Sequence, residues 1–403
     1  MRFFSVACVV AAMSLNACAP DVVSATPDAA ADQAAPLYVA ASDVAAPDVA
    51  APDVAAPDVA APDVAAPDVA ASDVAASDVA APDVAAPDAP DPVDVTDPVD
   101  APTPSGRDLS VLGPNRIAIW TGPIAGTNGN ARVFYPMTAG DARYPLVTFT
   151  HGFQLAVNNY DRLLAHVASW GYVVASVSYP GTILSTDHRN VAAAQSAARR
   201  AFMGGGPAGF PAGARVDAAR AIAMGHSLGG KGAIMALLDD SAFIAGLALD
   251  PVDDNPSPLG RITDATPSVA PERMSGLRRP LGLFGATQSR CGFMACAPTA
   301  NNYQQFASAA PAGSTVVTWP LNNFGHMDFV DPGCGFACNT CSGGAAPIDT
   351  RIVALRELTV SFLERFARGD TSVQGALDGA RRAELLRAGA LWDGATATLP
   401  ACR

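Results

Sequence analysis

Apolar positions in residues 108–403 fall into two kinds of segment that alternate along the chain. Short, nearly uninterrupted apolar runs, such as 144–150 and 172–178, are typical of strands buried inside a parallel sheet. Segments such as 159–170 repeat an apolar residue every three or four positions, which predicts amphipathic helices. Strands that alternate with helices predict an α/β fold with a mainly parallel central sheet and helices on both faces.

The same patterns place the individual elements and the domain limits. Strands are expected at 116–120, 131–135, 144–150, 172–178, 221–224, 243–249, 281–285 and 314–319, and helices at 159–170, 189–203, 233–238 and 349–366. These elements predict one α/β domain over 108–368. Residues 369–403 are expected to form a short helical appendix, which Cys402 could hold to the domain.

Residues 19–107 have a different composition. From Asp21 to Asp100 the unit Ala-Pro-Asp-Val-Ala recurs, and this stretch holds 17 Asp and no Lys or Arg. The net charge of −13 therefore belongs to this stretch, and the rest of the chain is slightly positive. Proline and like-charge repulsion predict a disordered, extended stalk, although a repeat expansion without a selected length fits the sequence equally well.

Residues 1–18 have the pattern of an export signal. Arg2 precedes an apolar segment over 3–13, and a small residue precedes Cys18. This is the pattern of a bacterial lipoprotein signal, so Cys18 is expected to be lipidated and to anchor the protein to the outer membrane or cell surface. The alternative is ordinary cleavage nearby and a freely secreted protein. The apolar segment is too short to span a membrane comfortably.

Six cysteines follow the stalk, and an even number in an exported chain predicts disulfides. They are Cys291, Cys296, Cys334, Cys338, Cys341 and Cys402. Six cysteines allow 15 pairings, so the connectivity stays open. A zinc site at the 334–341 cluster is the alternative, but no fourth ligand is evident nearby, and no metal is expected.

The sequence Gly225-His226-Ser227-Leu228-Gly229 follows an apolar run and precedes a helical pattern. This G-x-S-x-G in a strand–turn–helix context predicts the nucleophile elbow of an α/β-hydrolase, with the Ser227 hydroxyl exposed on a strained turn. The two glycines are needed because strand and helix pass too close there for a Cβ. The start of the helix also favours developing negative charge.

A serine nucleophile needs a base, and His326 fits that role because it follows the last predicted strand. The other histidines fit other places: His151 after an early strand, His166 on a helix as a surface or partly packed residue, His188 in a polar loop, and His226 with its side chain pointing away from the elbow.

The acid of a triad must lie between Ser227 and His326. No Asp or Glu occurs from Met274 through His326. The end of the penultimate strand, where the acid of a triad usually lies, therefore has no carboxylate. Asp250 ends the strand before that one and is the predicted acid, with Asp253 as the alternative. The backbone N–H groups of Phe153 and Leu228 are the predicted oxyanion hole.

Several of these segments resemble the chlorophyllase family and its dienelactone-hydrolase and polyester-hydrolase relatives over roughly residues 130–366. They are His151-Gly-Phe with Tyr160, the segment 164–174, Gly225-His-Ser-Leu-Gly-Gly-Lys231, Asp250-Pro-Val252, Cys296-Ala-Pro-Thr299 and Gly325-His-Met-Asp328. The resemblance implies an acid after this earlier strand, at Asp250. Leu228 stands where chlorophyllases typically have arginine.

The motifs together predict a serine-dependent ester hydrolase, carboxylesterase- or lipase-like, that works through an acyl-enzyme without metal or organic cofactor. Alternatives are a polyester (cutinase-like) hydrolase, a transacylase, and a non-catalytic binding lipoprotein on a hydrolase scaffold. Phe153, Leu155 and Leu228 suggest an apolar pocket for a small-molecule, lipid or polymer ester. There is no basic run, so no nucleic-acid partner is expected, and we expect a monomer.

Overall fold

The computed structural model describes residues 106–137, 142–182, 186–211, 215–253, 265–291, 295–334, 341, 343–344, 348–394 and 399–402. All of them belong to one compact unit, residues 94–403. The predicted signal with Cys18, and all but the end of the predicted stalk, lie outside the described residues.

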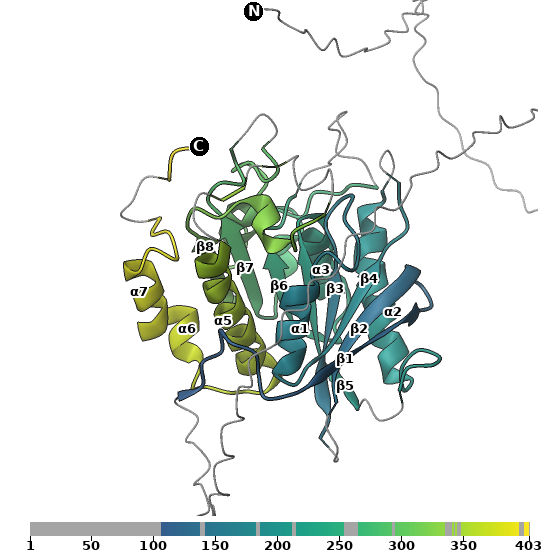
Figure 1. Cartoon of the computed structure of the whole chain (residues 1–403). Helices are drawn as coiled ribbons and strands as arrows, with labels where there is room; N and C mark the ends of the chain where they lie inside the picture. The colour runs from purple at the N-terminus through teal and green to yellow at the C-terminus, as the bar shows by residue number, and fades with distance from the viewer. Residues whose placement is uncertain are drawn as a thin grey trace, which may run out of the picture. The chain divides into compact units, whose positions relative to one another are not determined.

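An eight-stranded sheet forms the centre of this unit, with the strand order β1-β2-β4-β3-β5-β6-β7-β8 (Figure 1). The strands are β1 (Ile117–Pro123), β2 (Asn128–Pro136), β3 (Tyr144–Thr150), β4 (Val173–Ser178), β5 (Val216–His226), β6 (Phe243–Leu249), β7 (Leu281–Ala286) and β8 (Val316–Leu321). β1 and β2 pair antiparallel, as do β2 and β4, and every later pairing is parallel. The predicted mainly parallel sheet is therefore confirmed.

Helices cover both faces of the sheet, as the alternating pattern predicted (Figure 1). The helices are α1 (Asp161–Ser169), α2 (His188–Met203), α3 (Leu228–Asp239), α4 (Tyr303–Ser308), α5 (Ile348–Ala367), α6 (Gln374–Asp378) and α7 (Ala380–Arg387), with short 3₁₀ turns at Met274–Gly276 and His326–Phe329. α1 and α5 pack on one face, and α2 and α3 pack on the other. Because both faces are covered, the central strands are buried along nearly their whole length.

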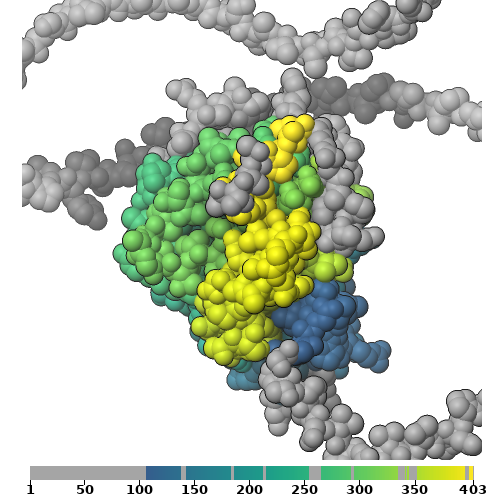
Figure 2. All heavy atoms as spheres, turned by 90° about the vertical axis from the view of Figure 1, so that its left-hand side faces the viewer, coloured from purple at the N-terminus to yellow at the C-terminus, as the bar shows by residue number. Residues whose placement is uncertain are grey.

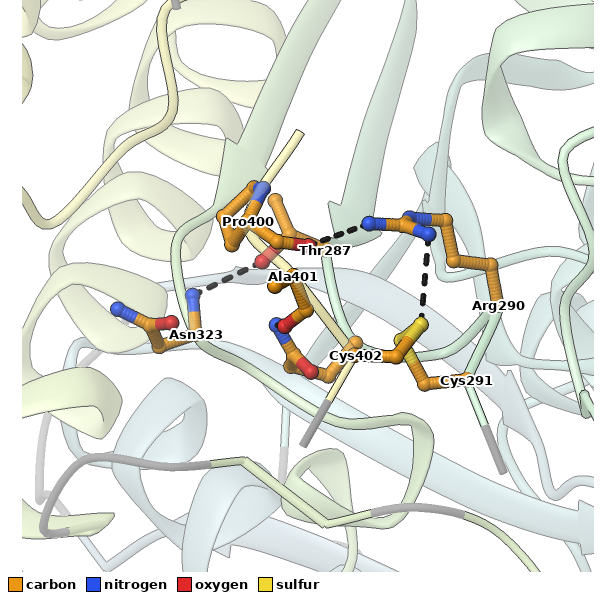
Figure 3. Close-up of a disulfide and its surroundings, with 8 residues drawn as sticks. Thr287, Arg290, Cys291, Asn323, Pro400, Ala401 and Cys402 are labelled. Carbon is orange, nitrogen blue, oxygen red and sulfur yellow. Dashed lines mark hydrogen bonds between the residues drawn. A yellow bond between two sulfur atoms is a disulfide. The ribbon is translucent and has the colours of Figure 1, made fainter. Parts of the chain in front are cut away.

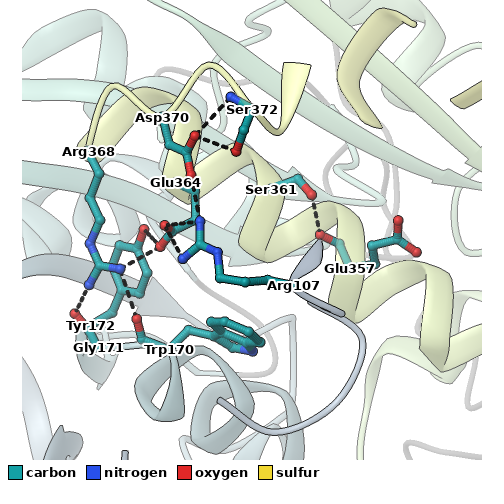
Figure 4. Close-up of polar contacts among 10 residues, drawn as sticks. All are labelled: Arg107, Trp170, Gly171, Tyr172, Glu357, Ser361, Glu364, Arg368, Asp370 and Ser372. Carbon is teal, nitrogen blue, oxygen red and sulfur yellow. Dashed lines mark hydrogen bonds and ion pairs between the residues drawn. The ribbon is translucent and has the colours of Figure 1, made fainter. Parts of the chain in front are cut away.

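The start and end of the domain meet at the edge of the sheet where the parallel strands begin. Buried Glu364, near the end of α5, accepts hydrogen bonds from the Tyr172 hydroxyl at 2.8 Å and from Arg368 at 2.6 Å (Figure 4). Arg107, among the first described residues, approaches the same carboxylate at 3.4 Å and pairs with Asp370 at 2.6 Å. The predicted stalk therefore joins the domain at the edge opposite the one where the parallel strands end.

The C-terminal residues cover the β8 edge of the sheet. Leu391 forms an antiparallel bridge with Leu321, and the Trp392 N–H donates to the Pro320 carbonyl at 2.8 Å. In Figure 2 this segment (yellow) lies on the surface against the green residues of that side. Such coverage occupies the hydrogen-bonding groups that an open edge strand would expose.

The predicted disulfides are confirmed for two pairs, Cys291–Cys402 and Cys296–Cys341. Cys334 is also disulfide-bonded, and Cys338 lies outside the described residues. The first pair holds the chain end to the turn after β7, and Arg290 reinforces it by donating to the Pro400 carbonyl and to Cys402 Sγ (Figure 3). Disulfides of this kind indicate a protein that folds in an oxidising compartment, outside the cytoplasm. No helix in the described part of the chain is long and apolar enough to cross a membrane.

Candidate active site

Ser227 occupies the sharp turn between β5 and α3. Its backbone has φ 56° and ψ −120°, a conformation that non-glycine residues rarely adopt, and it is the residue before the first turn of α3. The elbow glycines are needed at this turn. A Cβ on Gly225 would lie 2.2 Å from the Gly229 carbonyl oxygen, and one on Gly229 would lie 2.0 Å from that of Thr150. Only glycine lets strand and helix approach so closely, which explains the motif's spacing.

Asp250 and His326 meet at the edge of the sheet where the parallel strands end. Asp250 directly follows β6, and His326 follows β8 and begins a 3₁₀ turn. His326 Nδ1 lies 2.7 Å from Asp250 Oδ2, and both side chains are buried. Since a carboxylate oxygen only accepts, Nδ1 carries the proton and Nε2 is left as the basic nitrogen.

The structure brings His326 next to the elbow, but the described residues show no hydrogen bond between His326 and the Ser227 hydroxyl. His326 instead packs on His226, the neighbour of Ser227, with 4.6 Å between ring centroids. On the other side, a Cβ on Gly152 would lie 3.2 Å from Ser227 Cβ. The loop after β3, the elbow and the loop after β8 therefore converge on one point.

Two further donors hold the Asp250 carboxylate. The Ala286 N–H donates to Oδ1 at 3.1 Å, and the buried Ser289 hydroxyl donates to Oδ2 at 2.5 Å. Asp250 itself has φ 42°, a second strained residue at this site. Sequence reasoning did not include Ser289. Its place directly beyond the end of β7, the strand beside β6, is the signal that could have suggested it.

Asp253, the alternative acid, has other partners. Its carboxylate lies 2.9 Å from the ammonium of Lys231, and both side chains are almost fully buried. It also accepts hydrogen bonds from the backbone of Val269 and Ala270 and from the Ser268 hydroxyl. The pair ties the first turn of α3 to the loop that begins with Asp250, and Lys231 was part of the family resemblance without an assigned role.

His226 is completely buried and makes a specific contact. Its Nδ1 lies 2.8 Å from the Tyr160 hydroxyl, which also accepts a hydrogen bond from the Gly152 N–H at 3.0 Å. When the Tyr160 hydroxyl donates to Nδ1, the ring proton of neutral His226 is on Nε2, which has no hydrogen-bond partner among the described residues. Burial, and secondarily the neighbouring His326, hold the pKa of His226 well below its usual value. His226 is therefore a neutral ring that supports His326.

The Gly152 carbonyl is held from the opposite side of the loop. It accepts from His151 Nδ1 at 2.8 Å and from the Tyr179 hydroxyl at 3.3 Å. His151 Nε2 in turn faces the Ser178 hydroxyl at 2.9 Å, which fixes a single neutral tautomer. Burial lowers the pKa of His151 to about 4, so this arrangement persists at neutral pH. The peptide that joins Gly152 to Phe153 is consequently fixed in orientation.

Two histidine predictions were wrong. His166 is fully buried, because the segment before β1 covers α1: its Nε2 lies 3.0 Å from the Leu109 carbonyl. His188 is the first residue of α2 and is also buried, not in a loop. Burial lowers the pKa of each to about 4. Neither lies in the candidate site, and within the described residues no group of His, Cys, Asp and Glu side chains is arranged to hold a metal ion.

A match to a known protein family spans the elbow, Asp250 and His326. The chlorophyllase family model matches residues 127–378, which include all three. The chain belongs to the chlorophyllase family. The predicted resemblance is thereby confirmed, and with it an ester hydrolase of the α/β-hydrolase type.

Individual relatives match this chain at similar levels of sequence identity. The chloroplastic chlorophyllase-1 of Citrus sinensis is 24% identical over 241 residues, which cover 58% of this chain and 71% of that protein. A bis(hydroxyethyl) terephthalate hydrolase of Streptomyces coelicolor is 24% identical over 246 residues, 60% of this chain and 64% of that protein. Chlorophyllase-1 of Arabidopsis thaliana is 28% identical over 215 residues, 50% of this chain and 63% of that protein. The relatives thus carry names that refer to two different substrates.

Proposed function

We propose that the protein is a serine esterase in which Ser227, Asp250 and His326 form a catalytic triad. Ser227 Oγ attacks the ester carbonyl while His326 Nε2 accepts its proton. His326 then protonates the alcohol as it departs. The acyl group stays bound to Ser227. A water molecule, deprotonated by the same histidine, releases the acid.

The observation that carries this proposal is the hydrogen bond between His326 Nδ1 and Asp250 Oδ2 beside the elbow. It selects the tautomer in which Nε2 can act as a base, and the negative carboxylate stabilises the imidazolium that forms. The contact between serine and histidine often tightens only when substrate binds, so its absence without substrate is compatible with the role.

The proposed oxyanion hole consists of the N–H groups of Phe153 and Leu228. The N–H of a trans peptide points away from its carbonyl. Because His151 and Tyr179 hold the Gly152 carbonyl, the Phe153 N–H of the same peptide is directed to the other side of the loop. Leu228 begins α3, whose first N–H groups have no partners inside the helix and favour an anion.

A non-catalytic binding protein on the same scaffold is the rival from another class. Ser227 and Asp250 both adopt positive φ, and each such residue costs about 1–3 kcal/mol. Catalysis explains this strain, and binding alone does not require it. A polyester hydrolase is the second candidate, because one relative is named for a terephthalate ester and Leu228 replaces the arginine typical of chlorophyllases.

The proposed setting is the exterior of the cell, with the esterase over 108–368 carried on a stalk over 19–107. Lipidation of Cys18, which becomes the N-terminus when the preceding residues are cleaved off, would anchor it, and simple secretion is the alternative. The C-terminal appendix, 369–403, closes the domain through Cys402. We propose a monomer that acts on small-molecule, lipid or polymer esters.

A panel of esters tests the proposal. Wild type and Ser227→Ala are compared on p-nitrophenyl esters of increasing acyl length, triglycerides, a polyester film and a chlorophyll-type pigment. Turnover of at least one substrate by wild type, absent from Ser227→Ala, is expected. A folded wild type that hydrolyses none of them would favour the binding protein. Adding a competing alcohol and analysing the products separates hydrolysis from acyl transfer.

A further inference from the structure

A pocket of about 210 Å³ lies beside the loop that carries the proposed oxyanion donor. His151 and Phe153–Leu155 form one side of it. Asn128 at the start of β2, together with Ser178, Tyr179 and Thr186, contributes to the rest. We call it the His151 pocket. None of the steps proposed above uses it, although it adjoins the peptide that they depend on.

The described lining of the His151 pocket contains no Asp, Glu, Lys or Arg. His151 is its one titratable group near neutral pH, and burial keeps it uncharged there. The nearest charges along the chain, Asp187 and Arg189, pair with each other at 2.6 Å. The described lining residues therefore offer a charged group in the pocket no opposite charge to replace the water that it gives up.

The lining also indicates what the pocket can accept. Phe153, Leu155 and Tyr179 offer apolar and aromatic surface, and the amides of Asn128 and Gln154 offer neutral donors and acceptors. The volume is below the roughly 300–1,000 Å³ typical of sites for drug-sized ligands. A short or single-ring group fits such a space, and a long isoprenoid or acyl chain does not.

We propose that the His151 pocket is the subsite for one flank of the ester, and that it selects small uncharged groups, aromatic or short aliphatic, over their carboxylate-bearing counterparts. This rests on the proposed esterase function and names its substrate class. The selected substrates are neutral esters with a compact group on one side, and a half-ester that keeps a free carboxylate is a poor substrate.

Asn128 provides the variant for the test. It lines the pocket and is exposed, so a charge introduced there stays in contact with water. Asn128→Lys and Asn128→Glu introduce opposite charges, and Asn128→Gln is the neutral control. Two pairs of substrates, each a neutral ester and its carboxylate counterpart, place the charge on one flank or the other. On the acyl side they are p-nitrophenyl methyl succinate and p-nitrophenyl succinate. On the alcohol side they are methyl 4-butyryloxybenzoate and 4-butyryloxybenzoate.

Wild type and Asn128→Gln are expected to show kcat/KM at least about tenfold higher for the neutral member of one pair. Asn128→Lys should narrow that ratio about three- to tenfold and Asn128→Glu should widen it, both effects weakening with added salt. Equal ratios in all four proteins for both pairs would overturn the proposal.

Failure of the subsite and failure of the esterase function are distinguishable. Hydrolysis of p-nitrophenyl acetate by wild type, absent from Ser227→Ala, reports the esterase function independently of the Asn128 variants. If acetate ester is cleaved but the ratios do not respond, the subsite is wrong and the esterase stands. If wild type cleaves no ester, the proposed function itself fails.

Discussion

His326 Nδ1 lies 2.7 Å from Asp250 Oδ2, although the two residues are 76 positions apart in the sequence. The parallel sheet causes this meeting, because β6 and β8 end at the same edge with β7 between them. The proposed esterase function depends on this hydrogen bond. The bond also distinguishes the two candidate acids, because His326 contacts Asp250 while Asp253 pairs with Lys231.

Asp250→Asn and Asp253→Asn are expected to fail in different ways. Asp250→Asn keeps the fold but loses the tautomer control of His326, so kcat should fall about 10⁴-fold. Asp253→Asn removes the carboxylate that pairs with the buried ammonium of Lys231 and should cost about 3–5 kcal/mol of stability. Steady-state kinetics at a temperature where both variants are folded, together with urea unfolding, measure the two effects. Equal loss of kcat in the folded variants would contradict the assignment of Asp250.

Ser289→Ala removes the hydroxyl that donates to Asp250 Oδ2. Hydrogen bonds to charged groups contribute about 1.5–3 kcal/mol, so we expect kcat to fall about 10- to 100-fold with KM nearly unchanged. Ser275→Ala, on the exposed 3₁₀ turn at 274–276, is the matched control and should behave as wild type. A Ser289→Ala enzyme with full kcat would show that the Ala286 N–H suffices to hold the carboxylate.

Gly229→Ala should destabilise the whole domain. Its Cβ would lie 2.0 Å from the Thr150 carbonyl oxygen and 2.6 Å from that of His151, both backbone atoms that cannot rotate away. We expect a loss of about 3 kcal/mol or more in the free energy of unfolding. Gly343→Ala, where nothing lies within 4 Å, should change it by less than about 0.5 kcal/mol. Two variants of equal stability would argue against the close strand–helix contact.

Stability should fall as the pH drops from about 6.5 towards 4. Burial lowers the pKa of His151, His166 and His188 from 6.5 to about 4, so between these values the unfolded chain binds more protons than the folded one. Between these pH values, each such histidine lowers the free energy of unfolding by about 1.4 kcal/mol for every pH unit of acidification. Its stabilising contribution is complete above pH 6.5.

His166→Gln tests this dependence away from the candidate site. Glutamine can still donate to the Leu109 carbonyl but does not titrate. Urea unfolding at pH 7, 6 and 5 should give a slope lower than that of wild type by up to about 1.4 kcal/mol per pH unit. An unchanged slope would mean that His166 titrates alike in the folded and unfolded chain.

Patterns that depend on neighbouring residues predicted most of this fold. The central strands are apolar because both faces are covered, and the elbow is recognisable because its glycines are required by local sterics. Asp250 could be singled out as the candidate acid because the region from 274 to 326 holds no carboxylate. Both inferences need only the chain order and the chemistry of each residue type.

Contacts between distant segments could not be predicted in this way. His166 was expected near the surface because nothing in α1 shows that residues 109–113 cover it. Ser289 and Tyr179 are common polar residues whose roles come from the strands beside them. The six-residue α4 is too short for a periodic pattern, and the Cys291–Cys402 pairing is one of many that the spacing permits.

Labelling with a fluorophosphonate probe tests the central claim most directly. The probe is applied to the purified chain and the modified residue is located by mass spectrometry, with Ser227→Ala as the blank and Asp250→Asn as the attenuated control. The esterase account predicts a single adduct on Ser227, formed much more slowly in Asp250→Asn. A folded wild type that stays unlabelled, or that is labelled on another residue, would contradict it.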